Sequence, residues 1–309
     1  MSVFGQKLAS LFGLLGKAEE TARKLPLHQH PDIERISRGL PLHGPRLMKR
    51  KGPGTEFFEA RAFAHGDDPR RIHARLSARR DEPIVVEKEA EIRQHFYLWR
   101  DSRPSMDFES GKAPYTPRQA ADIMLLALAK HIARNDERVG LLEGTRLTQG
   151  GRAAEWVATQ MAEIPDNNSG TPHIRAHLVH NSCAVLFSDF MMPVTQLEQT
   201  LDRLRQSGIS GWLVMVADPQ LIDFNFKGDT LFYGLNNEGE KNFEKAESPQ
   251  LRRHYQKEFK NHIETIDTLA RRKGFDFILQ RTDEELFKGL RALYNLEPKV
   301  PAAVMKLGL

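Results

Sequence analysis

Two short apolar runs in this sequence each end at a carboxylate, and these carboxylates are its strongest candidates for chemistry. Residues 96–100 are mostly aromatic or aliphatic and are followed by Asp101, while residues 183–187 are followed by Ser188 and Asp189. Such runs predict strands that are buried on both faces of a sheet. In open α/β sheets, ligands bind in the crevice beyond the carboxyl ends of the strands. We therefore expect Asp101 and Asp189 to face a polar crevice.

The residues after the first run resemble a known cation site with one departure. The segment reads Asp101-Ser102-Arg103-Pro104-Ser105. A strand followed by Asp-x-Ser-x-Ser begins the metal-ion-dependent adhesion site of von Willebrand factor A domains, and Asp101 and Ser105 match that pattern. Arg103 stands where the pattern has its first hydroxyl, and a guanidinium is always charged and has no lone pair to donate. We expect a degenerate site with no cofactor or only weakly bound Mg²⁺, in which Arg103 pairs with Asp101 or Asp189 instead.

Several short motifs, taken in order, resemble the bacterial domain-of-unknown-function 58 family. They are Gly-Asp-Asp-x-Arg-x-Ile, an Ala-Arg pair, a strand ending in Asp-x-x-x-Ser-Met, and Ser-Asp-Phe-x-x-Pro. The resemblance covers roughly residues 40–295, and the strand reading Leu-Trp-Arg-Asp is similar to the short soluble branch of the family. His73 and Ala74 stand where the family usually has Asp-Trp. The motif residues of the N-terminal part are Gly66, Asp67, Asp68, Arg70 and Arg79.

The resemblance implies a fold, a site and a partner. Family members resemble von Willebrand factor A domains, so we expect an α/β fold with a mostly parallel sheet, helices on both faces, and a small N-terminal β-rich unit. The implied site brings Asp101, Ser105 and Asp189 together, and such oxygen ligands suit Mg²⁺. It also takes a threonine from the loop after the second strand, for which Thr145 and Thr148 are candidates. The implied partner is a MoxR-type AAA+ ATPase.

These patterns divide the chain into four parts. Residues 1–53 are expected to hold an amphipathic helix and an extended arm, and residues 54–93 the small β-rich unit. Residues 94–296 are expected to form the von Willebrand factor A-like domain, and residues 297–309 a tail. The periodicity at residues 4–15 predicts a helix that docks on the body of the protein or on a partner, with membrane contact as an alternative.

Composition limits the remaining functional classes. The 309 residues are 40% hydrophobic and carry a formal net charge of +4. Residues 1–93 have 18 Lys or Arg and 13 Asp or Glu, a balance of +5, so the rest of the chain sums to −1. Basic clusters at residues 46–51 and 70–80 make nucleic acid a candidate partner. However, no aromatic residues interleave with the second cluster, which disfavours stacking on bases.

The chain has one cysteine, Cys183, in an apolar run. It therefore forms no disulfide within the chain, which suits a reducing compartment, and no run approaches 18 uninterrupted apolar residues. We expect a cytoplasmic protein in which Cys183 is a small buried hydrophobe. His173, His177 and His180 would share one face of a helix, but the apolar alternation around them favours a strand over a zinc site.

Two kinds of function stay open. The first is a non-enzymatic protein-interaction adaptor that works with an AAA+ ATPase. The second is a metal-dependent hydrolase in which Asp101 and Asp189 hold a metal that activates water, although no nearby His or Lys is an obvious general base. Nucleic-acid binding through the basic N-terminal part is a third and weaker alternative. For the Asp67, Asp68, Arg70 and Arg79 cluster we expect a buried ion-pair and hydrogen-bond network that locks the small unit to the large one, rather than catalysis. Asp68 followed by Pro69 also suits the start of a helix over residues 70–79, with Pro at its first position.

Overall fold

The computed structural model describes residues 2–26, 57–64, 67–80, 82–88, 94–226, 229–233, 241–245 and 249–294. By contacts, the chain divides into a large unit of residues 1–41 and 94–309 and a small unit of residues 42–93. The expected extended arm and tail, and Gly66, lie outside the described residues.

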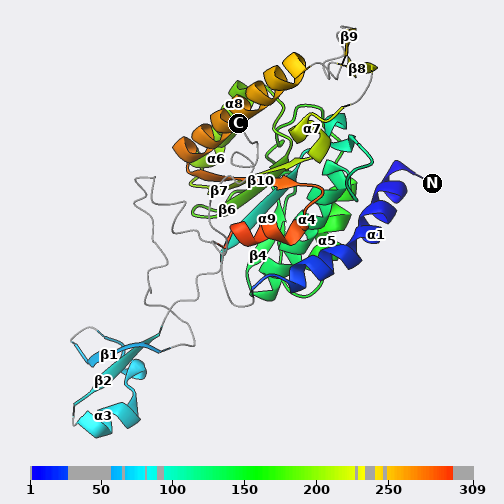
Figure 1. Cartoon of the computed structure of the whole chain (residues 1–309). Helices are drawn as coiled ribbons and strands as arrows, with labels where there is room; N and C mark the ends of the chain where they lie inside the picture. The colour runs from blue at the N-terminus through cyan, green and yellow to red at the C-terminus, as the bar shows by residue number, and fades with distance from the viewer. Residues whose placement is uncertain are drawn as a thin grey trace. The chain divides into compact units, whose positions relative to one another are not determined.

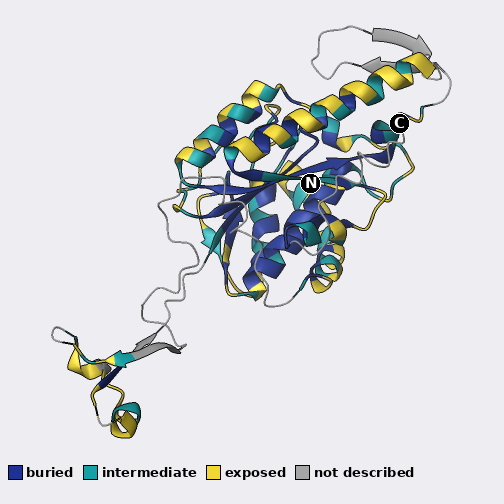
Figure 2. Cartoon of the chain, turned by 60° about the vertical axis from the view of Figure 1, so that its left-hand side comes forward, coloured by how far each residue is buried: buried dark blue, intermediate teal, exposed yellow. Residues whose placement is uncertain are grey.

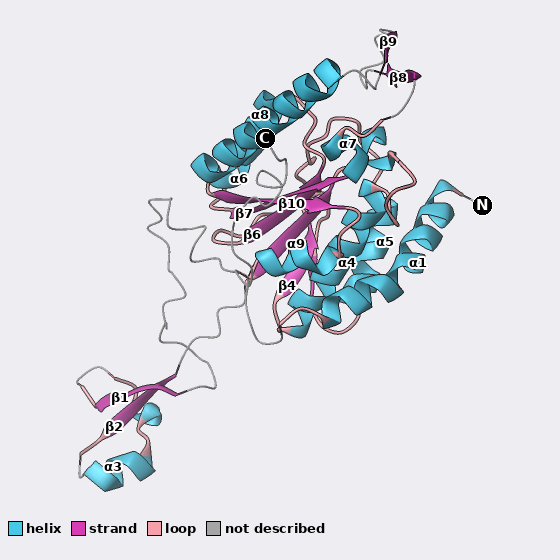
Figure 3. Cartoon of the chain, viewed as in Figure 1, coloured by secondary structure: helices cyan, strands magenta, loops and turns pink. Residues whose placement is uncertain are grey.

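The large unit is built on a six-stranded sheet in the order β10-β7-β6-β3-β4-β5 (Figures 1 and 3). Its strands are β3 (His95–Arg100), β4 (Arg138–Leu141), β5 (Leu147–Thr148), β6 (Cys183–Ser188), β7 (Ser210–Ala217) and β10 (Phe275–Arg281). The neighbouring strands are parallel except for β5, which runs antiparallel to β4 at the edge. The two apolar runs are adjacent, with Trp99 opposite Leu186, so the predicted pairing of these strands is confirmed.

Helices cover both faces of this sheet, which confirms the predicted α/β class. On one face α4 (Pro117–Arg134), α5 (Ala153–Glu163) and α9 (Leu286–Ala292) share a core with alternate strand residues such as Leu98 and Val185. On the other face α6 (Val194–Gln206), α7 (Pro219–Asp223) and α8 (Pro249–Lys273) pack against the residues between them, such as Trp99 and Leu186. Figure 2 shows the sheet buried between the two helical layers. Alternation of this kind follows from the period of two along a strand.

The helix after β3 illustrates how local sequence sets the element boundaries. Thr116 caps α4 by accepting a hydrogen bond from the backbone N–H of Gln119, whose side chain accepts one from the Thr116 N–H in return. Pro117 occupies the first helical turn, where its missing N–H costs nothing. This capping box places the start of α4 beside the carboxyl end of β3.

The N-terminal helix belongs to the large unit. Helix α1 (Val3–Arg23) packs on α4, α5 and α9, and it buries Leu11, Ala18 and Ala22. The predicted stripe at residues 4–15 is only partly buried, since Phe4 and Phe12 are among the exposed apolar side chains. The buried face instead extends to the small residues Ala18 and Ala22, which allow α1 to approach its neighbours closely. Lys7 at its start forms an ion pair of 3.1 Å with Asp166, in the loop after α5.

The small unit pairs β1 (Phe57–Ala62) with β2 (Ile84–Lys88) in an antiparallel hairpin. One helix was expected over residues 70–79, with Pro69 at its first position, and this prediction is wrong. Asp68 instead caps a short 3₁₀ turn, η1 (Pro69–Arg71), and α3 (Ala74–Arg80) begins three residues later. The break has a physical cause, because Ile72 bridges to Val85 and the His73 N–H donates to the Ile84 carbonyl.

The structure also bears on the histidines at residues 173–180, on membrane spans and on Cys183. Residues 173–180 form neither a helix nor a strand, so the three histidines do not share a helix face. Within the described part of the chain, no helix is both long and apolar enough to cross a membrane. Cys183 is buried, and burial raises the pKa of its thiol to about 12, which fits an unreactive core residue.

A second hairpin, β8 (Asp229–Tyr233) with β9 (Lys241–Lys245), lies between α7 and α8 in the sequence. The residues joining the two strands are not among those described.

Candidate functional site

The predicted carboxylates lie at the topological switch point of the sheet, where the strand order changes direction. From β3 the chain adds β4 and β5 on one side, and it then crosses to add β6 on the other side. Loops leaving β3 and β6 therefore lead to opposite faces of the sheet, and this is the position at which open α/β sheets bind ligands. Arg100 is paired with Phe187 across these strands, and the Asp101 N–H donates to the Phe187 carbonyl over 2.9 Å. Asp101 and Asp189 thus emerge close together.

Arg103 joins the two carboxylates. Its Nε and Nη2 donate to Asp101 Oδ2 over 2.9 and 2.6 Å, and Nη2 also donates to Asp189 Oδ1 over 2.5 Å. Its side chain is only 12% exposed, with Asp101 at 0% and Asp189 at 11%. Burial alone would lower the pKa of Arg103, but the hydrogen bonds and charges of Asp101 and Asp189 outweigh it and the pKa is raised. The guanidinium is therefore a permanent cation between two carboxylates.

Backbone and hydroxyl groups fix both carboxylates. Asp101 Oδ1 accepts the Arg103 N–H over 2.9 Å, and Asp101 Oδ2 accepts the hydroxyl of Ser188 over 2.7 Å. Asp189 Oδ1 accepts the Met191 N–H over 2.9 Å. In the described part of the chain, Asp189 Oδ2 has no hydrogen-bond partner. The remaining accepting capacity of the cluster therefore lies mainly on that one oxygen.

Two arginines behind the cluster hold the backbone that carries Arg103. Arg118, in the first turn of α4, donates from Nη2 to the carbonyls of Ser102 and Arg103 over 2.9 and 3.1 Å, and it also pairs with Asp107. Arg100 donates from Nε to Asp122 over 2.7 Å and from Nη1 to the Asp101 carbonyl. These contacts hold the loop after β3 against α4, so the backbone that carries the Arg103 side chain has a fixed position.

The loop after α5 packs against Ser102 and Arg103. Ser102 Oγ donates to the Asn167 carbonyl over 3.0 Å and accepts the Asn167 N–H over 2.8 Å. At Gly170, where φ is +71°, a Cβ atom would stand 2.6 Å from Arg103 Nε. Only glycine fits there, because it tolerates the positive φ and leaves room for the guanidinium. A cavity of about 30 Å³, lined in part by Arg100, Ser102 and Asp166, is the size of one or two waters rather than of a substrate.

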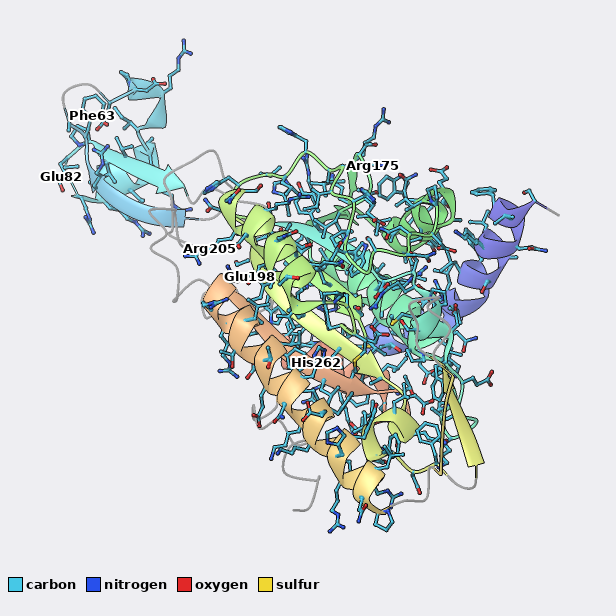
Figure 4. All side chains as sticks on the ribbon, turned by 90° about the horizontal axis from the view of Figure 1, so that it is seen from above. Phe63, Glu82, Arg175, Glu198, Arg205 and His262 are labelled. Carbon is cyan, nitrogen blue, oxygen red and sulfur yellow. The ribbon has the colours of Figure 1, made fainter. Side chains whose placement is uncertain are left out.

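The turn that presents Asp189 is strained and braced. Phe190 is fully buried and has φ of +49°, a conformation that is unfavourable for a bulky residue. Its N–H donates to Ser188 Oγ over 2.9 Å, and its carbonyl lies 2.8 Å from His262 Nε2 on α8, which fits an Nε2–H donor. Figure 4 labels His262 on α8, together with Glu198 and Arg205 on α6. Arg272 of α8 pairs with Glu198, so the helix that braces the turn is itself anchored.

These residues do not suit a divalent cation while Arg103 keeps its position. A bound Mg²⁺ would need the oxygen lone pairs that the guanidinium occupies, at about 2.1 Å. The cation would then lie roughly 4 Å from the guanidinium carbon, where repulsion is on the order of 8 kcal/mol at an effective dielectric near 20. Ser105 Oγ, the remaining predicted ligand, is buried and has no hydrogen-bond partner in the described residues. Within those residues, no group of three or more His, Cys, Asp or Glu side chains could hold a metal ion.

Other predicted site residues are not part of the cluster. Thr148 pairs with Val139 near the start of β4, and neither Thr145 nor Thr148 hydrogen-bonds to the cluster in the part of the chain described. The N-terminal motif was expected to form a buried ion-pair and hydrogen-bond network that locks the small unit to the large one, and the contacts within the small unit form only part of such a network. Asp67 pairs with Arg61 over 2.6 and 2.7 Å and Asp68 caps η1, whereas Arg70 and Arg79 are exposed.

Sequence reasoning missed the residues that complete the site from the loop after α5. Asn167 and Gly170 come from a polar loop whose position depends on tertiary packing, and no motif signalled them. Asn167 also donates to Glu143 over 3.2 Å, which links this loop to the end of β4. The Asn167–Gly170 sequence, Asn-Asn-Ser-Gly, is typical of a tight turn, and that was its one available signal.

Comparison with known proteins gives one family and distant relatives. A family model described as "Protein of unknown function DUF58" matches residues 59–265. An uncharacterized protein of Mycobacterium bovis is 24% identical over 259 residues, which cover 79% of this chain and 80% of that protein. Uncharacterized proteins of two Mycobacterium tuberculosis strains match with the same identity and coverage.

Proposed function

Since the chain belongs to the DUF58 family, we propose that it is a cytoplasmic, non-enzymatic adaptor whose crevice binds another protein and works with a MoxR-type AAA+ ATPase. The observation that carries the proposal is the Arg103 bridge between Asp101 and Asp189. A crevice whose carboxylates are already paired offers a rigid, shaped surface rather than a reactive centre. Affiliation with the ATPase comes from the resemblance to the family.

The proposed fold identity is von Willebrand factor A-like. Its support is the sheet order β10-β7-β6-β3-β4-β5 with an antiparallel edge strand, and the position of Asp101 and Asp189 at the topological switch point. In this interpretation the crevice is a metal-ion-dependent adhesion site in which a built-in guanidinium replaces the metal ion. Fold likeness alone does not assign function, so the proposal is tied to this site.

The alternative is a metal-dependent hydrolase, and one observation bears on it. Asp189 Oδ2 has no hydrogen-bond partner in the described residues, so it is the carboxylate oxygen that could act as a general base on water. Against this, Asp101 Oδ2 accepts three hydrogen bonds, two of them from Arg103. A hydrolase would lose turnover in Asp189→Ala, whereas an adaptor has no turnover to lose.

The test is a binding measurement between the full-length protein and the purified MoxR-type AAA+ ATPase of the same organism. Met191, two residues after Asp189, is 38% exposed and lies at the crevice. We expect Met191→Glu to weaken binding at least tenfold, because it places a charge in the contact surface.

Val179 supplies a matched control. It is 39% exposed and precedes the start of β6, so it lies before the amino end of the strand whose carboxyl end leads to Asp189. Val179→Glu should bind the ATPase as the wild type does. Absence of binding by the wild-type protein, with or without ATP, would contradict the proposed partner. Equal loss in both variants would contradict the crevice as the contact surface.

A further inference from the structure

The small unit presents a basic face that no described residue of the same unit neutralises. We define the basic face as the four exposed arginines on η1 and α3: Arg70, Arg75, Arg79 and Arg80. None of them forms an ion pair with a described residue of the small unit. Few acidic side chains are described in this unit. Asp67 pairs with Arg61, Asp68 caps η1, and Glu82 is exposed (Figure 4).

The basic face is held in a fixed orientation. The Ser77 hydroxyl donates to the His73 carbonyl over 3.0 Å and accepts the Ile84 N–H over 2.9 Å, which fastens α3 to β2. Leu76, beside Ser77, is half-buried, and Ile84 and Val85 of β2 are buried. The opposite side of α3 therefore faces away from β2, and the helix is coloured mainly as exposed in Figure 2. Arg75 and Arg79, four residues apart, share that outer face.

Local helix energetics do not account for these arginines. The macrodipole favours Arg79 and Arg80 in the last turn of α3, but it gives no advantage to Arg70 or Arg75. Like charges four residues apart also destabilise a helix, by about 0.2–0.5 kcal/mol. A rigid surface that collects unpaired arginines is complementary to an anionic partner.

We infer that the basic face is a docking surface for an acidic protein segment. The surface also contains apolar groups, because Ile72, between Arg70 and Arg75, is 36% exposed and Ala74 and Ala78 are exposed on α3. Arginine beside exposed apolar side chains is the composition of protein interfaces. A nucleic-acid backbone would gain from the charges but not from Ile72, and neither η1 nor α3 carries a Phe, Tyr or Trp that could stack on bases. This inference stands independently of the AAA+ ATPase.

The experiment measures fluorescence anisotropy of two labelled probes with the full-length protein, a short peptide rich in Asp, Glu and Leu and a short DNA duplex. We expect the peptide to bind, and the double variant Arg75→Glu/Arg79→Glu to lower its affinity about tenfold through loss of two charge pairs. Ile72→Ser, which leaves the backbone bridge intact, should weaken peptide binding and leave DNA binding unchanged.

A matched control has the same change of net charge elsewhere. Arg146 and Arg152 are exposed on the large unit, and Arg146→Glu/Arg152→Glu should bind the peptide within about twofold of the wild type. Equal losses in the two double variants would overturn the inference by showing a nonspecific charge effect. It would also be overturned if the peptide failed to bind, or if DNA bound more tightly and only its binding depended on Arg75 and Arg79.

Discussion

Replacing Arg103 by Met is expected to destabilise the protein by about 3 kcal/mol, because it leaves two buried carboxylates without their shared cation. The wild-type arrangement carries one positive and two negative charges, with Asp101 fully buried and Asp189 11% exposed. Met has a similar length to the arginine stem, so loss of charge and hydrogen bonds dominates over loss of packing. Thermal unfolding should show a midpoint lowered by roughly 6–12 °C.

A second substitution separates the charge effect from general damage. In the Arg103→Met background, Asp189→Asn removes one of the uncompensated charges and should restore part of the lost stability. Arg152→Met, at an exposed arginine, should change the free energy of unfolding by less than about 0.5 kcal/mol. If Arg103→Met cost less than about 1 kcal/mol, the bridge would not be a structural element of the site.

Substituting Gly170 by Ala is expected to have the second large effect, because the new methyl group would press on the Arg103 side chain. The new Cβ would stand 2.6 Å from Arg103 Nε, and φ at this residue is +71°. Strain at positive φ costs about 1–2 kcal/mol, and displacement of a packed side chain adds about 1–3 kcal/mol. Chemical denaturation should therefore show a loss of about 2–5 kcal/mol.

Gly150 provides a control with the same backbone strain and none of the contact. Its φ is +85°, and a Cβ built there meets nothing within 4 Å. Gly150→Ala should cost only the strain, about 1–2 kcal/mol. The excess cost of Gly170→Ala should shrink when Arg103 is already Met, which a double-mutant cycle measures. Equal costs at the two glycines would contradict the close packing of the Asn167–Gly170 turn on Arg103.

Much of the large unit could be predicted from local sequence because its signals agree with one another. The runs at residues 96–100 and 183–187 are apolar, of strand length, and end at Asp101 and Ser188, so both strand type and carboxyl end could be identified. Thr116 with Gln119 is a complete capping box, which fixed the start of α4. The pairing of Arg103 with Asp101 or Asp189 followed from charge alone, and the structure has it with both.

Predictions failed where tertiary contacts override local preference. A helix was expected over residues 70–79 because Asp68-Pro69 is a good helix start, but the bridge of Ile72 to Val85 divides that segment. Charge spacing also does not reveal which way side chains face, and within the small unit Arg70 and Arg79 are exposed. The loop at residues 167–170 carries no chemical motif, and its place over Arg103 depends on the hydrogen bonds between Asn167 and Ser102.

The most direct test of the central claim, that Arg103 occupies the position of a cation, is calorimetric titration with Mg²⁺ and Mn²⁺. We predict no micromolar binding to the wild-type protein, because the oxygens of Asp101 and Asp189 that a metal ion would need accept hydrogen bonds from the guanidinium. Arg103→Ser, which removes the positive charge and adds a hydroxyl, should bind the ions. Micromolar binding by the wild type that disappears in Asp189→Ala would contradict the account.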